Sequence, residues 1–108
     1  MPRTYLTATG DAVRTLAHQL AAARRGQRRT ADEVAARAGM TRATLRRVER
    51  GDPSVAIGLY FEVAMVLGVP LFGADRRQLA ELAARGERDL ALLPSRVRAR
   101  ATRIDDDF

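Results

Sequence analysis

Residues 28–54 read RRTADEVAARAGMTRATLRRVERGDPS, and this stretch decides the fold. Thr30 and Glu33 have the spacing of a capping box, in which the threonine hydroxyl accepts from the Glu33 N–H and the glutamate carboxylate accepts from the Thr30 N–H. The box predicts a short helix over residues 31–38. Gly39 then supplies the left-handed conformation that a tight helix end requires.

A second short helix is expected after Thr41, whose hydroxyl can cap it. Leu45 and Val48 lie three residues apart and would both turn inward, and the Gly-Asp-Pro sequence at residues 51–53 would end the helix. The two helices would then meet across residues 39–40. Two short helices joined by a glycine-containing turn are typical of a helix-turn-helix.

The chain around this stretch indicates an all-helical architecture. Segments rich in Ala, Leu, Arg and Glu are punctuated by single Gly, Pro and Thr residues, and no convincing period-two pattern precedes the tail. Three further helices are expected at residues 12–25, capped by Asp11, at residues 55–67, capped by Ser54, and at residues 75–85, closed by Gly86. The expected organisation is a flexible N-terminus over residues 1–10, one domain over residues 11–86, and a C-terminal tail over residues 87–108.

The charge of the chain is concentrated in its first half. All 19 basic residues are arginines, and residues 1–51 hold 11 of them against four acidic residues, whereas residues 52–108 are nearly neutral. An excess of one sign in one half indicates a surface that faces a polyanion, and nucleic acid is the leading candidate. RNA is the weaker candidate, because aromatic residues that stack on exposed bases are scarce.

The composition gives little support to other classes of function. Cysteine is absent and histidine occurs once, so we expect no metal site, no cofactor and no thiol nucleophile. Without a glycine-rich phosphate loop or a nucleophile motif, the chain is not expected to be an enzyme. No apolar stretch approaches the roughly 20 residues that cross a bilayer, and the N-terminus lacks a signal-peptide pattern, so we expect a soluble, cytoplasmic protein.

The second helix of the pair would expose an arginine face. At about 100° per residue, Leu45 and Val48 define its buried side. The opposite side would carry Ala43, Arg46, Arg47 and Arg50, with Arg42 at the leading turn. The major groove of DNA admits a helix of this kind, and arginine can donate two hydrogen bonds to guanine O6 and N7. A solvated face, or one that only grips phosphates, is the alternative.

Residues 28–54 resemble the Cro/CI-type (XRE) helix-turn-helix family, whose usual pattern is T-Q-x-x-L-A-x-x-x-G-V-S-x-x-x-I-x-x-x-E-x-G. The positions that agree at the correct spacing are Thr30, Val34, Ala35, Gly39, Met40, Thr41, Leu45, Glu49 and Gly51. The resemblance extends over about residues 12–72. It implies a five-helix, lambda-repressor-like domain that binds an operator in double-stranded DNA.

The resemblance also implies which residues meet the bases and which hold the domain together. The positions that commonly contact base edges are Thr41, Arg42, Ala43, Arg46 and Arg47. Arg42 and Arg47 are the preferred candidates for specificity. Arg24 and Glu49 stand where the family frequently has an ion pair that ties the first helix to the recognition helix.

Phosphate contacts follow from the same resemblance, with one departure from the pattern. The positions that often meet phosphates are Thr30, Thr44 and Ser54. The family usually has a phosphate-binding glutamine directly after the first cap, where this chain has Ala31. Arg28 and Arg29, just before the cap, could supply a charge-assisted phosphate contact instead.

A single recognition helix reads few base pairs, so such proteins usually bind as two-fold dimers to half-sites about 34 Å apart. The helix expected over residues 55–67 is apolar nearly all round. Either it lies at the centre of the domain, or its second face is buried against another copy of the chain. The candidates for dimerisation are Leu59, Val63, Val66 and Phe72.

A narrower resemblance links the C-terminal half to HipB-like antitoxins, which accompany HipA-type kinase toxins. It rests on GDPSVAIGLYFEVAMVLGV at residues 51–69, a Leu-rich segment, PSRVRAR at residues 94–100 and the terminal DDDF. It implies a homodimer that represses its own operon and binds a toxin through an arm in which Arg96, Arg98 and Arg100 project to one side. A disordered tail is the alternative for this arm. An independent repressor, or an interaction module that mainly neutralises a toxin, is the alternative for the function.

Overall fold

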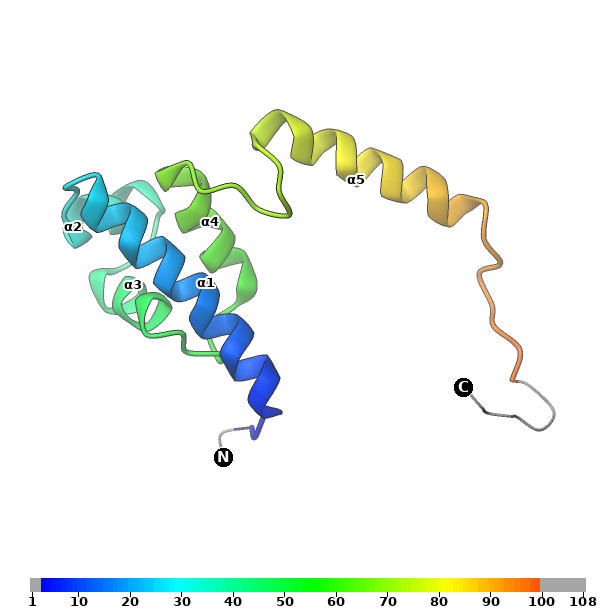
Figure 1. Ribbon diagram of the computed structural model, residues 1–108, viewed down its shortest axis with the longest axis horizontal. Helices are drawn as coiled ribbons and strands as arrows, with labels where there is room; N and C mark the ends of the chain where they lie inside the picture. Colours follow the sequence, from blue (N-terminus) through cyan, green and yellow to red (C-terminus); the bar gives the residue numbers. More distant parts are fainter. Residues whose placement is uncertain (1–2, 100–108) are drawn as a thin grey trace. The chain divides into compact units, whose positions relative to one another are not determined.

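The computed structural model describes residues 3–99, and these residues fold into α-helices joined by short loops (Figure 1). The helices are α1 (Thr7–Gly26), α2 (Ala31–Arg37), α3 (Arg42–Glu49), α4 (Ile57–Leu67) and α5 (Arg76–Ala91). Within residues 3–99 the only strand-like pairing is an isolated bridge between Leu71 and Ala74. The all-α, five-helix class predicted from the sequence is therefore confirmed. None of the helices in this part of the chain is long and apolar enough to span a membrane.

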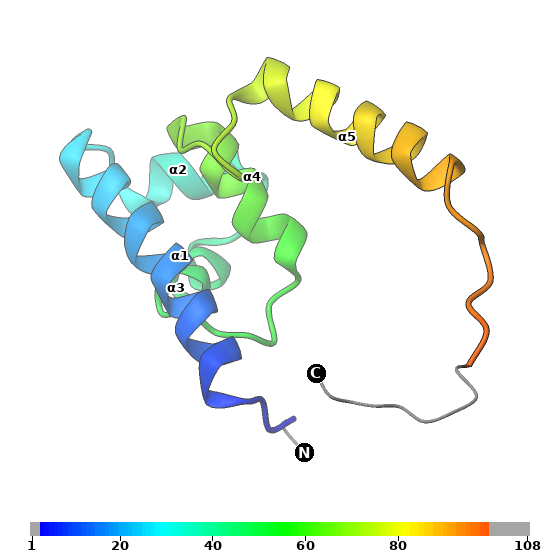
Figure 2. The same cartoon turned by 45° about the vertical axis from the view of Figure 1, so that its right-hand side comes forward.

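Of the described residues, those from 3 to 76 form one compact unit, and its core is built by helices α1 to α4. The largest fully buried side chains are Leu20, Val34, Leu45, Val48 and Val63. Helix α2 packs against α3, and α1 packs against both α3 and α4 (Figure 2). Burying each leucine or valine stabilises the fold by about 1.5–3 kcal/mol, so these few side chains hold four short helices together.

The turn between α2 and α3 forms as its sequence predicts. Thr30 Oγ1 accepts a hydrogen bond from the Glu33 N–H at 3.1 Å, and Thr41 Oγ1 accepts one from the Thr44 N–H at 3.1 Å. Gly39 has a φ of 71°, in the left-handed region that favours glycine. Two capped helices therefore meet across a single glycine turn.

The second half of the predicted capping box does not form. Instead of accepting from the Thr30 N–H, the Glu33 carboxylate pairs with Arg29 at 3.3 Å and with Arg37 at 3.8 Å. Two guanidinium groups attract the carboxylate more strongly than one neutral N–H does. Glu33 therefore belongs to an ion-pair cluster at the surface of α2.

The close approach of α3 to α1 depends on Gly51. Its φ of 74° is left-handed, and a Cβ at this position would lie 2.8 Å from Arg14 Cγ and 3.0 Å from Arg14 Cα. Any other residue here would push the end of α3 away from α1. The glycine that matches the family pattern is thus required both by the backbone conformation and by packing.

The predicted starts of two helices are wrong, each for a local reason. Helix α1 begins at Thr7 rather than Ala12, because Asp11 pairs with Arg14 inside the helix instead of capping it, so residues 7–10 are not a flexible terminus. Helix α4 begins at Ile57, since the Ser54 hydroxyl is engaged by Asp52 and is not its cap.

Helix α5 continues through Gly86 to Ala91, so the predicted boundary between domain and tail falls inside it. One glycine costs a helix only about 1 kcal/mol relative to alanine, and the helical pattern resumes after it. None of the α5 residues is buried, and Leu82 and Leu90 are among its exposed side chains. Residues 92–99 follow without helix or strand.

Candidate nucleic-acid interface

Helix α3 separates its apolar and basic side chains as the sequence predicts. Leu45 and Val48 are fully buried against the domain core. The side chains on the opposite, exposed face are those of Arg42, Ala43, Arg46, Arg47 and Arg50. Because α3 is rigidly seated by its buried side, this basic face has a fixed direction relative to the rest of the domain.

A half-buried ion pair fixes the C-terminal end of α3 to α1. Arg24 Nε donates to Glu49 Oε2 at 2.7 Å and Arg24 Nη2 donates to Glu49 Oε1 at 3.1 Å, with side chains only 15% and 13% exposed. The hydrogen bond to Glu49 raises the pKa of Arg24 against the opposing effect of burial. Arg24 Nη1 also donates to the Arg29 carbonyl oxygen at 3.0 Å. The pair expected from the family resemblance is therefore present and connects α1, α3 and the loop before α2.

The second arginine pair of α3 lies at the surface and joins the helix to the loop that follows it. Arg47 Nε donates to Asp52 Oδ2 at 3.0 Å, and Arg47 Nη2 donates to Ser54 Oγ at 2.9 Å. Ser54 in turn donates to Asp52 Oδ1 from its N–H at 2.9 Å and from its hydroxyl at 2.7 Å. The Ser54 hydroxyl is therefore occupied inside this network.

The Asp52 loop is anchored to the core by Tyr60 of α4. The Tyr60 hydroxyl donates to the Asp52 carbonyl oxygen at 2.7 Å, and burial together with the nearby Asp52 charge raises the pKa of Tyr60. The hydrogen bonds from Ser54, followed by the one from Arg47, lower the pKa of Asp52 from 3.8 to about 2. Asp52 thus stays ionised at every pH at which the protein would act.

The other arginines of the α3 face are less constrained. Arg42 Nη1 lies 3.5 Å from Asp32 Oδ1, and both side chains are largely exposed. Arg46 and Arg50 have no hydrogen bond or ion pair from their side chains to residues 3–99. These guanidinium groups are therefore available to an external anion.

The Arg29 guanidinium, predicted to contact a phosphate, is bound inside the domain. Its guanidinium donates to the Val66 carbonyl oxygen at 3.0 Å, to Gln27 Oε1 at 3.3 Å and to both Glu33 carboxylate oxygens at 3.3 Å. The group is mostly covered and ties the loop before α2 to the end of α4. Arg28 is exposed instead, with a left-handed φ of 58°, and remains the basic residue at the start of α2 that can reach a phosphate.

The predicted dimerisation residues fall into two classes. Val63 is completely buried inside the domain, so it cannot lie at an interface, and its assignment is wrong. Leu59 and Val66 are half-buried, and Phe72 is 78% exposed with its ring 6.0 Å from Phe61 in an edge-on arrangement.

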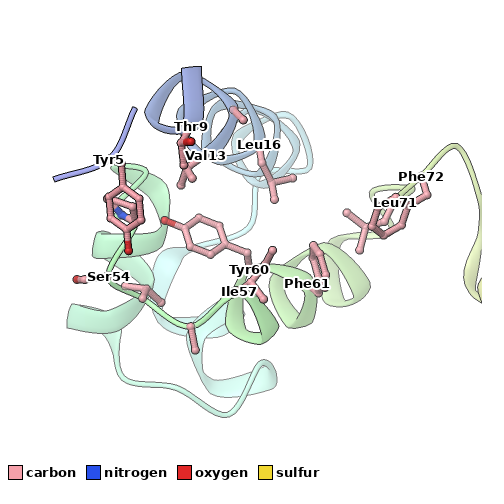
Figure 3. A pocket seen from close by; sticks show the side chains of 14 residues that line it. Tyr5, Thr9, Val13, Leu16, Ser54, Ile57, Tyr60, Phe61, Leu71 and Phe72 are labelled. Carbon is pink, nitrogen blue, oxygen red and sulfur yellow. The ribbon is translucent and has the colours of Figure 1, made fainter. Parts of the chain in front are cut away.

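Phe72 also borders an apolar pocket of about 620 Å³ between α1 and α4 (Figure 3). Thr9, Val13 and Leu16 line it from α1, and Ile57, Tyr60 and Phe61 line it from α4. Ser54, which accepts from Arg47 of the basic face, also lines this pocket, so apolar surface is left open on this unit next to the loop that follows α3.

The remaining predicted residues lie in the C-terminal segment. Arg96 and Arg98 are exposed in the non-helical residues after α5. Arg100 lies outside the described residues.

The geometry of a capped helix pair with a projecting basic helix defines a helix-turn-helix DNA-binding protein. The model of a helix-turn-helix family (HTH_3) matches residues 20–73, which is half of the chain. The chain belongs to this family, the XRE or Cro/CI type, and is a DNA-binding transcriptional regulator whose partner is double-stranded DNA. The comparisons with curated proteins and with solved structures gave no match.

Asp52 and Tyr60 are parts of the site that the sequence analysis does not assign to it. Residues 51–53 predict only the end of a helix, and Ser54 is predicted only as a cap or a phosphate contact. The Asp-Pro-Ser sequence carries a usable signal, since an aspartate that accepts from the N–H two residues later forms an Asx turn. The contact to Arg47 carries no such local signal.

Proposed function

We propose that the protein is a sequence-specific repressor that places α3 in the major groove of a palindromic operator. The observation that carries this proposal is the basic face of α3, which stands opposite the buried Leu45 and Val48. The side chains proposed to meet base edges are Thr41, Arg42, Ala43, Arg46 and Arg47. Arg46 also suits a phosphate, because its guanidinium is unpaired among residues 3–99.

Phosphate contacts would come from residues around the two helix starts. The proposed residues are Arg28, Thr30 and Thr44. Arg29 and Ser54 are left out, because their polar groups are used inside the domain. Only a cationic side chain neutralises a phosphate and releases counterions, so each arginine–phosphate contact should add about −0.9 to the slope of log affinity against log salt, and the threonine contacts should add nothing.

The test begins with selection of duplexes from a randomised DNA library by the full-length protein. Affinity for the best selected duplex and for a shuffled duplex of the same composition is then measured over a salt series. Arg42→Ala and Arg47→Ala should each lower the preference for the selected duplex, whereas Arg28→Ala should weaken both duplexes alike. If Arg42→Ala and Arg47→Ala left both affinity and preference unchanged, the assignment of α3 to base recognition would be wrong.

A homodimer is part of the proposal, because two half-sites about 34 Å apart give the specificity that one helix lacks. The support is the apolar side chains that the domain leaves accessible: Phe72 is exposed, and Leu59 and Val66 are half-buried. Phe72→Asp should shift the chain from dimer to monomer in sedimentation equilibrium and reduce cooperative binding to a palindrome. Leu6→Asp, which charges another exposed apolar side chain, is the matched control and should leave the dimer intact.

The finer proposal is that this regulator is the HipB-like antitoxin of a toxin–antitoxin pair and represses its own operon. It is supported by the sequence resemblance over residues 51–69 and 94–100 and by the exposed leucines of α5. A reading frame for a HipA-type kinase beside this gene would supply the probe. The Arg96→Ala/Arg98→Ala/Arg100→Ala protein should then lose binding to that kinase and keep its affinity for DNA.

Other outcomes distinguish the alternatives. If the triple variant kept its binding to both the kinase and DNA, these arginines would have no role in binding the toxin. A gene neighbourhood without a kinase would favour an independent XRE-type repressor. If the wild-type chain bound the kinase tightly and no selected duplex better than a shuffled one, its main activity would be neutralisation of the toxin.

A further inference from the structure

The loop after α3 holds one edge of the Arg47 guanidinium and leaves another edge open. A guanidinium has five N–H donors in a rigid fork. The Nε–H points to Asp52 Oδ2 at 3.0 Å, and one N–H of Nη2 points to Ser54 Oγ at 2.9 Å. These two N–H groups form one edge of the planar guanidinium. The second N–H of Nη2 and the two N–H groups of Nη1 remain, and they form the end of the fork.

The end of the fork is the part that suits a guanine. Two parallel N–H groups at the end of an arginine can donate to O6 and N7 of one guanine in the major groove. An arginine with free rotation can equally turn to a phosphate oxygen, which carries no sequence information. Fixing the side edge of Arg47 removes much of that freedom before DNA arrives and lowers the entropy lost on binding.

The group that fixes Arg47 is itself immobilised. The Asp52 carboxylate accepts twice from Ser54, and its own carbonyl oxygen accepts from the Tyr60 hydroxyl at 2.7 Å. Tyr60 is only 3% exposed and belongs to the core. The buried Tyr60 thus fixes Asp52, and Asp52 in turn fixes the Arg47 guanidinium.

We propose that Asp52 is a specificity-determining positioning residue, which directs the end of the Arg47 fork to a guanine and opposes its use as a phosphate grip. This inference rests on the proposed sequence-specific function of α3. The contrast with the neighbouring arginines supports it. Arg42 has one 3.5 Å approach to Asp32, and among residues 3–99 the side chains of Arg46 and Arg50 have no hydrogen bond or ion pair.

The charge of Asp52 has a second effect of opposite sign. A carboxylate beside the DNA-facing helix repels phosphates, so it lowers the affinity for DNA of any sequence. The same residue therefore raises discrimination and reduces general affinity. A residue that served only to close the loop would show the second effect without the first.

The experiment compares Asp52→Asn with Asp32→Asn in the full-length chain. Both changes remove one negative charge beside an arginine of the α3 face, and asparagine at 52 can still accept from the Ser54 N–H. The probes are the best duplex selected by the wild-type protein from a randomised library and a shuffled duplex of the same composition. Thermal unfolding of each variant verifies the fold.

Asp52→Asn should bind the shuffled duplex several-fold more tightly and lose about ten-fold of the preference for the selected duplex. Asp32→Asn should show a similar gain on the shuffled duplex and keep the preference within about two-fold. In an Arg47→Ala background, Asp52→Asn should have no further effect on preference, because the group that it positions is gone.

Different results would overturn the positioning role of Asp52 and the sequence-specific binding on which it rests. If the wild-type chain preferred its selected duplex and Asp52→Asn kept that preference, the positioning role would be overturned while sequence-specific binding stood. A further loss of preference in the Arg47→Ala background would also overturn it, because Asp52 would then act on another group. If the wild-type chain preferred no duplex, the proposed function itself would fall, and this inference with it.

Discussion

Two arginine–carboxylate pairs hold helix α3, and they differ in burial more than in chemistry. The Arg24–Glu49 pair has a 2.7 Å contact between side chains that are 15% and 13% exposed. The Arg47–Asp52 pair has a 3.0 Å contact between side chains that are 44% and 27% exposed. The first joins α3 to α1 inside the domain, and the second lies on the basic face that we propose contacts DNA. We therefore assign the first pair to the fold and the second to recognition, because burial decides what the loss of a partner costs.

The largest difference should appear in stability. Arg24→Ala leaves the half-buried Glu49 carboxylate without its partner, so the free energy of unfolding should fall by about 3 kcal/mol. Arg47→Ala breaks a surface pair and should cost less than about 1 kcal/mol. Chemical denaturation of both variants measures these losses. Equal losses would mean that burial does not separate the two pairs.

Discrimination between DNA sequences should show the reverse order. Arg47→Ala should remove about 1–3 kcal/mol of the preference for the selected duplex, the value of a bidentate contact to one guanine. Arg24→Ala, measured at a temperature where the variant is folded, should change the preference much less because its role is structural. Fluorescence anisotropy with selected and shuffled duplexes supplies both numbers. A larger loss of preference for Arg24→Ala would place the specificity in the orientation of α3 rather than in Arg47.

A smaller effect is expected at the other end of α3. Thr41→Ala removes the hydroxyl that accepts from the Thr44 N–H at 3.1 Å, and it should destabilise the protein by about 1 kcal/mol. Thr30→Ala removes the equivalent cap of α2 and is the matched control for stability. Thr41→Ser should restore most of the loss. If serine failed to do so, the methyl group and not the cap would be responsible.

The smallest effect concerns acid stability. The hydrogen bonds from Ser54, followed by the one from Arg47, lower the pKa of Asp52 in the folded protein to about 2 from 3.8, so these contacts stabilise the fold above about pH 4 and lose this contribution as pH falls towards 2. The difference in unfolding midpoint between the wild type and Asp52→Asn should therefore be present at pH 5 and shrink towards pH 2. Thermal unfolding across this range measures it. A difference that stayed constant down to pH 2 would show that the Asp52 charge does not act through its contacts with Ser54 and Arg47.

The features that the sequence predicts well are local. The caps at Thr30 and Thr41 and the turn at Gly39 depend on neighbours within three residues, and all three form as expected. The inward turn of Leu45 and Val48 follows from helical periodicity and is confirmed as well. These signals are sufficient to define the helix-turn-helix and the direction of its basic face.

The features that the sequence does not predict depend on contacts that are distant along the chain or on competition between partners. Arg29 is turned inward by the Val66 carbonyl, 37 positions away, which no local pattern reveals. Valine at position 63 is an apolar side chain that suits either a core or an interface. Only the packing of α1 against α4 assigns it to the core. Ser54 is drawn into the Asp52 network rather than into a helix cap, because its hydroxyl donates to the Asp52 carboxylate and accepts from the Arg47 guanidinium, a charged donor that outcompetes backbone N–H groups.

The most direct test of base recognition by Arg47 is a double-mutant cycle across the interface. Each guanine of the selected duplex is replaced in turn by 7-deazaguanine, which lacks the N7 acceptor, and affinity is measured for the wild type and for Arg47→Ala. At one guanine per half-site the two changes should be non-additive by about 1 kcal/mol or more, because both remove the same hydrogen bond. Additive losses at every guanine would contradict the proposal that Arg47 reads a base.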